Sequence, residues 1–224
     1  MMTLEQFDQL LFPNGKKEPI YSNMVGQDHL IKSIPTYSKD IECACKKAKD
    51  DFDVELLPYN DIEEYQICYF KIQLMRIKDY KEQLDFIYSH SSIAKSWMTT
   101  DLCNKHLKHP SFDIYKPYFF KFIKLDGVYQ RRFAYVLALK FAKDKAAVEL
   151  FLNNIIDDDN YYVYMSEAWL IAGMGIYYFD LVKDFLINSH HSIILKKKAI
   201  SKMIDSYRIS DKQKEELKKI RNEL

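Results

Sequence analysis

The chain has 224 residues, of which 48% are hydrophobic, and its 33 Lys and Arg nearly balance its 32 Asp and Glu. A net charge of only +1 excludes a protein that coats nucleic acid through bulk positive charge. The sequence holds no apolar run of about 18 residues and no basic N-terminal stretch followed by an apolar one, so we expect a cytoplasmic protein without a membrane span.

Helices are predicted along almost the whole chain, because five glycines and six prolines leave few turns. Apolar residues recur in steps of three and four, as in Ile62, Tyr65, Tyr69 and Ile72, whereas a strand would alternate. Helices are expected over residues 3–12, 36–49, 60–77, 80–89, 91–107, 111–124, 127–142, 145–156, 160–173, 176–188, 193–206 and 210–222.

Charge is unevenly distributed among these helices. Lys and Arg outnumber Asp and Glu in residues 91–146 and 191–224, whereas acidic residues dominate 40–90 and 147–190. Two basic segments separated by an acidic one are therefore hidden by the neutral total.

The four cysteines show neither CxxC spacing nor a framework of paired histidines. We interpret Cys43, Cys45, Cys68 and Cys103 as reduced structural thiols and expect no metal and no cofactor.

Short helices with short links favour paired-helix repeats. Trp97, Arg132 and Trp169 are 35 and 37 residues apart, close to the length of a two-helix HEAT unit, roughly 40 residues. The pattern predicts an all-α, HEAT-like helical-repeat solenoid (an ARM/HEAT superhelix) that forms a single domain over residues 1–224. Equivalent positions one repeat apart would place the three residues on one concave face.

Three local patterns could carry chemistry. Trp97 and Asp101 are four residues apart and share a helical face, with Lys105 expected one turn further on. Taken alone, this pattern also fits a half-buried indole beside a solvated carboxylate.

The adjacent arginines Arg131 and Arg132 open a helix and point about 100° apart, so only one can face a groove. Arginine suits phosphate recognition through its planar fork, although such a pair is also a common surface feature. Trp169 shares a face with Tyr162 and Met165, which fits a buried aromatic stripe as well as a sugar platform.

Together these patterns resemble a known family. The segments Lys95–Leu107, Gln130–Phe141, Tyr161–Trp169 and Leu195–Ser210 are similar to DNA alkylation repair glycosylases of the AlkD type. The resemblance covers residues 36–210; residues 1–35 match poorly, and residues 211–224 form a C-terminal helix.

The resemblance implies an enzyme that hydrolyses the N-glycosidic bond of positively charged N3- or N7-alkylated purines in double-stranded DNA without flipping the base. It implies that Asp101 is the catalytic carboxylate and that Trp97 packs against the deoxyribose. It further implies that Arg132 grips a backbone phosphate, that Trp169 closes the sugar cleft and that Lys140 contacts the backbone. A monomer is expected.

One position departs from the family pattern. Members often carry an arginine three residues after the late tryptophan, where this chain has Ala172. With the acidic segment 147–190, this predicts weaker and strongly salt-sensitive DNA binding. Two alternatives therefore stand beside the glycosylase: a catalytically weak or silent paralogue that binds unusual or branched DNA, and a protein-binding scaffold.

Overall fold

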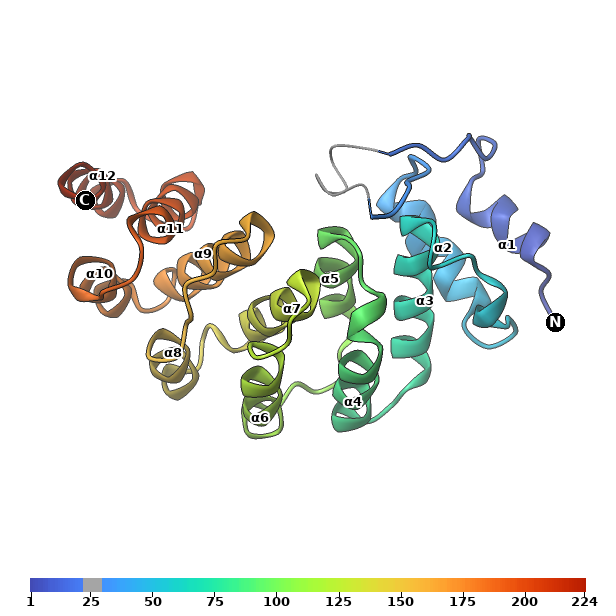
Figure 1. The fold of residues 1–224 in the computed structure, drawn as a ribbon, viewed down its shortest axis with the longest axis horizontal. Helices are drawn as coiled ribbons and strands as arrows, with labels where there is room; N and C mark the ends of the chain where they lie inside the picture. Colours follow the sequence, from blue (N-terminus) through green and yellow to red (C-terminus); the bar gives the residue numbers. More distant parts are fainter. Residues whose placement is uncertain (22–29) are drawn as a thin grey trace. The chain divides into compact units, whose positions relative to one another are not determined.

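The computed structural model describes residues 1–21 and 30–224, and the regular secondary structure of this described part is helical, apart from two isolated β-bridges (Figure 1). It divides into an N-terminal unit, Met1–Ser111, and a C-terminal unit, Phe112–Leu224. At the boundary between them His109 adopts a left-handed backbone conformation, with φ of 41°, just before Pro110. Each unit is described by itself.

The described residues of the N-terminal unit form five α-helices and three short 3₁₀ turns. They are α1 (Leu4–Leu11), α2 (Ser38–Ala48), η1 (Val54–Leu56), α3 (Glu63–Arg76), α4 (Tyr80–His90), η2 (Ser91–Ile93), α5 (Trp97–Cys103) and η3 (Asn104–His106). Helix α3 is the centre of this unit, because nearly all of its residues are buried and both α2 and α5 pack on it.

The C-terminal unit contains seven α-helices and one 3₁₀ turn. They are α6 (Phe112–Phe122), α7 (Val128–Ala138), η4 (Leu139–Phe141), α8 (Lys145–Leu152), α9 (Tyr161–Gly175), α10 (Phe179–Asn188), α11 (Ile193–Asp205) and α12 (Asp211–Glu223). Helix α9 packs on α7 and on α11, so these three helices form one layer, against which α6, α10 and α12 also pack.

Helix starts are set by side chains that satisfy the free N–H groups of the first turn. Thr3 and Ser210 form capping boxes with the glutamine three residues later, and Asp79, Ser96 and Asn160 each accept a bond from a backbone N–H of the first turn.

The prediction of an all-helical repeat protein is confirmed, and each predicted helix has a counterpart in the described residues. One prediction was wrong in detail: residues 91–107 are not a single helix but two 3₁₀ turns flanking α5. The chain is extended at Ala94 and again at Ser96, whose hydroxyl caps the new helix, so helical hydrogen bonding is interrupted there. None of the described helices is long and apolar enough to cross a membrane.

Candidate functional site

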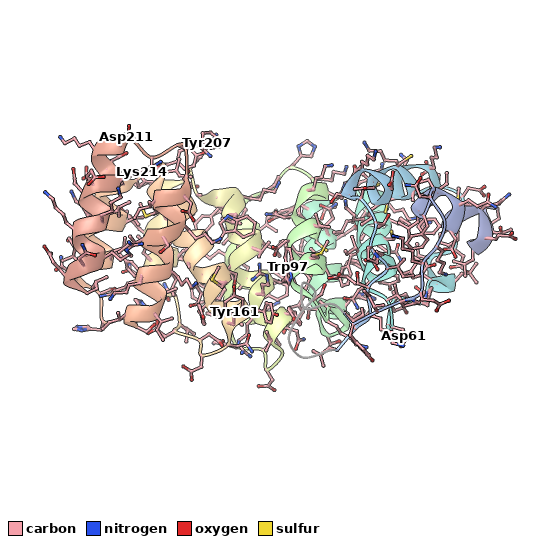
Figure 2. All side chains as sticks on the ribbon, turned by 90° about the horizontal axis from the view of Figure 1, so that it is seen from above. Asp61, Trp97, Tyr161, Tyr207, Asp211 and Lys214 are labelled. Carbon is pink, nitrogen blue, oxygen red and sulfur yellow. The ribbon has the colours of Figure 1, made fainter. Side chains whose placement is uncertain are left out.

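Helix α5 presents Trp97 and Asp101 on one face, one helical turn apart. Trp97 is the first helical residue, because the hydroxyl of Ser96 accepts the backbone N–H of Thr99 at 3.2 Å and starts the helix there. Figure 2 shows Trp97 on this helix. Both side chains are partly exposed, so the Asp101 carboxylate can be reached by water.

Thr100 lies buried between the two. Its hydroxyl is 2.8 Å from the carbonyl oxygen of Trp97 and 3.1 Å from Oδ1 of Asp101. A hydroxyl carries one proton, so it can donate to only one of these acceptors at a time. The Thr100 hydroxyl can therefore donate to the Asp101 carboxylate, or turn to the carbonyl of Trp97 instead.

Lys105 does not continue this face as predicted. The α-helix ends at Cys103, and Lys105 lies in the 3₁₀ turn η3, where its Nζ is 3.2 Å from Glu42. Burial would raise the pKa of Glu42, but the hydrogen bond and charge of Lys71, 2.9 Å away, outweigh it and lower the pKa to about 2. Lys105 is thus one member of an ion cluster behind α5.

A buried carboxylate lies next to the start of α5. Glu63, the first residue of α3, has no exposed surface and is close to Ser96. Burial raises its pKa to about 7; Glu64 acts in the same direction and Ser96 against it. The helix that carries Asp101 therefore starts next to a group that titrates near neutral pH.

In the C-terminal unit the two arginines of α7 have separate surroundings. Arg131 forms a two-point ion pair with Asp158, at 2.6 and 3.3 Å, and donates to the carbonyls of Leu125 and Asp126. Arg132 is 6% exposed, and its Nη1 donates to the carbonyl of Tyr162 at 2.5 Å. Arg131 therefore ties the link before α7 to the link before α9, while Arg132 ties α7 to the first turn of α9.

Trp169 and Lys140 are accessible from solvent. Trp169 is 41% exposed on α9, whereas Ala172, three residues later, is buried. Lys140 is exposed, but it lies in η4 and not on α7 with Arg132 as predicted, because α7 ends at Ala138.

Glu167 is a fully buried carboxylate of α9, two residues before Trp169. Burial raises its pKa to about 9, and the charge of Asp158 adds to the rise, against the Tyr135 hydroxyl and Arg131. It is therefore protonated at neutral pH, next to the Arg131–Asp158 pair.

The predicted residues fall into two groups, each brought together within one unit. Trp97 and Asp101 share α5, and Arg132 and Trp169 lie on the packed neighbours α7 and α9. The expectation that both groups line one concave face stays a prediction.

Comparison with known families gives one match. A family model described as DNA alkylation repair enzyme matches residues 34–213. The chain belongs to this family. The matched span agrees with the predicted 36–210 and contains all five predicted site residues. Searches of curated proteins and of solved structures gave no match.

Sequence reasoning missed the polar residues that hold the site of this DNA alkylation repair protein. Gln66 and Gln83 are buried and bond to the chain on either side of α5, and Asp158 binds Arg131. A signal existed for Gln66, because it lies beside Ile62 and Tyr69 in the apolar pattern of α3, where an uncharged polar residue must find partners.

Proposed function

We propose that this family member is a DNA glycosylase that hydrolyses the N-glycosidic bond of positively charged N3- or N7-alkylated purines in double-stranded DNA, without base flipping. The observation that supports it best is the pairing on α5: the partly exposed Asp101 lies one turn from the partly exposed indole of Trp97, inside the region that the family model matches.

The chemistry needs little more than a placed carboxylate. An alkylated purine already bears a positive charge, so the bond from its nitrogen to C1′ breaks with both electrons going to the base, which leaves neutral. The sugar becomes an oxocarbenium ion, which the Asp101 carboxylate stabilises electrostatically. Water then adds to C1′, and its proton passes to Asp101 acting as general base.

The other predicted residues have roles that fit their side chains. The indole faces of Trp97 and Trp169 would attract a cationic nucleotide, since aromatic rings carry negative charge on their faces. Lys140, exposed in η4 after the end of α7, and Arg132 would bind backbone phosphates. No metal or cofactor takes part in this proposal.

A second candidate, a catalytically weak or silent paralogue that binds unusual DNA structures, is favoured by two observations. Arg132 is only 6% exposed and already donates to Tyr162, and Ala172 supplies no phosphate contact. Such a protein would bind branched DNA at low salt and release no base.

Asp101→Asn separates these possibilities. We expect the wild type to release 7-methylguanine from methylated duplex DNA, and the variant to lose about 10²- to 10⁴-fold of that rate, the usual contribution of a general base. DNA affinity should change little. Asp113→Asn, the same change at an exposed aspartate of α6, is the control and should retain full activity. Equal rates in wild type and Asp101→Asn would exclude the proposed role of Asp101.

A further inference from the structure

Helix α5 is held in place at both ends by the side-chain amides of two buried glutamines. Gln66 projects from α3 and Gln83 from α4, and neither has any exposed surface. Together they bond to the chain before α5, within its first turn, and after it.

All the hydrogen-bonding groups of the Gln66 side chain are used, on the chain at the start of α5 and on Tyr59 in the link before α3. Its Nε2 donates to the carbonyls of Ile93, at 2.7 Å, and Tyr59, at 3.0 Å. Its Oε1 accepts the backbone N–H of Lys95 and the hydroxyl of Thr99, each at 3.0 Å. A primary amide offers two donors and two acceptor lone pairs, so every one of them is used.

Gln83 binds the chain that follows α5. Its Nε2 donates to the carbonyl of His106 at 2.9 Å and to that of Leu74, near the end of α3, at 2.7 Å. Its Oε1 accepts the backbone N–H of Lys108 at 2.7 Å. The chain that leaves α5 is thereby fixed to the end of α3.

These bonds add to the few hydrogen bonds that a short helix can form within itself. Seven residues form few internal hydrogen bonds, and helices shorter than about 12 residues are marginal in water. The backbone groups of Ile93, Lys95, His106 and Lys108 lie outside α5, and each of them is hydrogen-bonded to one of the two amides.

We propose that Gln66 and Gln83 are positioning residues of the reaction, which fix α5 so that Trp97 and Asp101 keep a constant place relative to the sugar. They touch no reacting atom and act through the backbone of residues 93–108. The inference rests on the proposed glycosylase function, since it concerns the same carboxylate. Its structural part, that the two amides hold residues 93–108, can be measured independently of activity.

The test compares Gln66→Leu and Gln83→Leu with two controls. Gln213→Leu makes the same change in the capping box of α12, and Val182→Ala makes a core defect in α10, so both lower stability away from α5. We call Gln66 and Gln83 the clamps of α5, and Gln66→Leu and Gln83→Leu the clamp variants. The rate of single-turnover base release should fall on the order of 10- to 100-fold in each clamp variant, the cost of displacing a catalytic group by about 1 Å. DNA affinity should stay within about twofold, as a change in the chemical step alone requires. Both controls should keep the wild-type rate.

Amide hydrogen exchange supplies the readout that does not need activity. Gln66→Leu should speed exchange of the Lys95 amide, and Gln83→Leu that of the Lys108 amide, each by about tenfold or more, because each amide loses the glutamine oxygen that accepts its hydrogen bond. Thr99→Val removes the hydroxyl that donates to Oε1 of Gln66 and that also lies 3.1 Å from the hydroxyl of Ser96, and it serves if Gln66→Leu does not fold; it should slow base release by a few-fold.

The outcomes separate the two proposals. If the wild type releases no base but the two amides exchange faster as described, the clamps stand as structural elements and the positioning role falls with the glycosylase. If the clamp variants match the controls in base release while the wild type is active, the positioning role is overturned. Unchanged exchange at Lys95 and Lys108 would overturn the clamps themselves.

Discussion

Helices α5 and α9 both carry a candidate site residue, but they are stabilised in different ways. Helix α5 has seven residues and is held by buried amides from α3 and α4. Helix α9 has fifteen residues and packs on both α7 and α11: a Cβ at Gly173 would lie 3.1 Å from the side chain of Leu139, just after α7, and one at Gly175 would meet the flexible end of Met203 on α11. The position of Asp101 therefore depends on the hydrogen bonds of two glutamine side chains, whereas the position of Trp169 depends on packing along a whole helix.

The largest effect on stability should come from breaking the Arg131–Asp158 ion pair, which joins the links before α7 and α9. Arg131→Ala removes both bonds to Asp158 and leaves a carboxylate whose side chain is only 14% exposed. We expect the free energy of unfolding to fall by about 2–3 kcal/mol, below the range for fully buried pairs because this one is partly solvated. Urea denaturation measures it.

Arg132→Ala should act differently, although it changes the neighbouring residue to alanine as well. It removes a proposed phosphate contact, so DNA affinity should fall and the slope of log affinity against log salt should flatten by about 1. If Arg131→Ala gave the larger change in salt slope and Arg132→Ala did not alter it, the roles assigned to the two arginines would be reversed.

These arginines illustrate how far the sequence could predict the site. Helical spacing placed the helices well, because apolar periodicity and capping residues such as Ser210 are local signals. The spacing also showed that Arg131 and Arg132 diverge, but not which one is bound to Asp158, since that partner lies 27 residues away in a different link. The sequence around a polar residue does not reveal which distant residue it binds.

The break before α5 was missed for the same reason. Residues 91–107 have a helical composition, but the chain is extended around Ala94, where long-range bonds from Gln66 hold Ile93 and Lys95. Trp97 and Asp101 were nevertheless placed on one face, because Ser96 starts a helix at the right residue. The local part of the site followed from sequence; the groups that hold it did not.

The next prediction concerns how the stability of the protein depends on pH. Each unit has a buried carboxylate with a raised pKa, and the two should act over different pH ranges. The folded pKa of Glu167 is about 9 against an ordinary 4.5, so between these values the folded protein binds a proton that the unfolded chain releases. The contribution of Glu167 to the free energy of unfolding therefore falls as pH rises from about 4.5 to 9. Glu167→Gln should flatten this decline and stabilise the protein at pH 8 by on the order of 1–3 kcal/mol.

Glu63 gives the matched measurement in the N-terminal unit. Its folded pKa is about 7, so its contribution falls between about 4.5 and 7 and is constant above. Glu63→Gln should flatten the stability curve only in that narrower window. Thermal unfolding from pH 5 to pH 9 would show the difference, and identical curves for the two variants would contradict these pKa values.

The smallest expected change in stability comes from removing a serine N-cap, and two such caps can be compared. Ser96 starts α5 and Ser210 starts α12, each accepting a backbone N–H of the first turn at 3.2 or 3.3 Å. Ser96→Ala and Ser210→Ala should each lower the free energy of unfolding by about 1 kcal/mol. Only Ser96→Ala should also slow base release, by a few-fold, because only α5 carries the proposed carboxylate. Slower release in Ser210→Ala as well would mean that activity follows overall stability and not the fixing of α5.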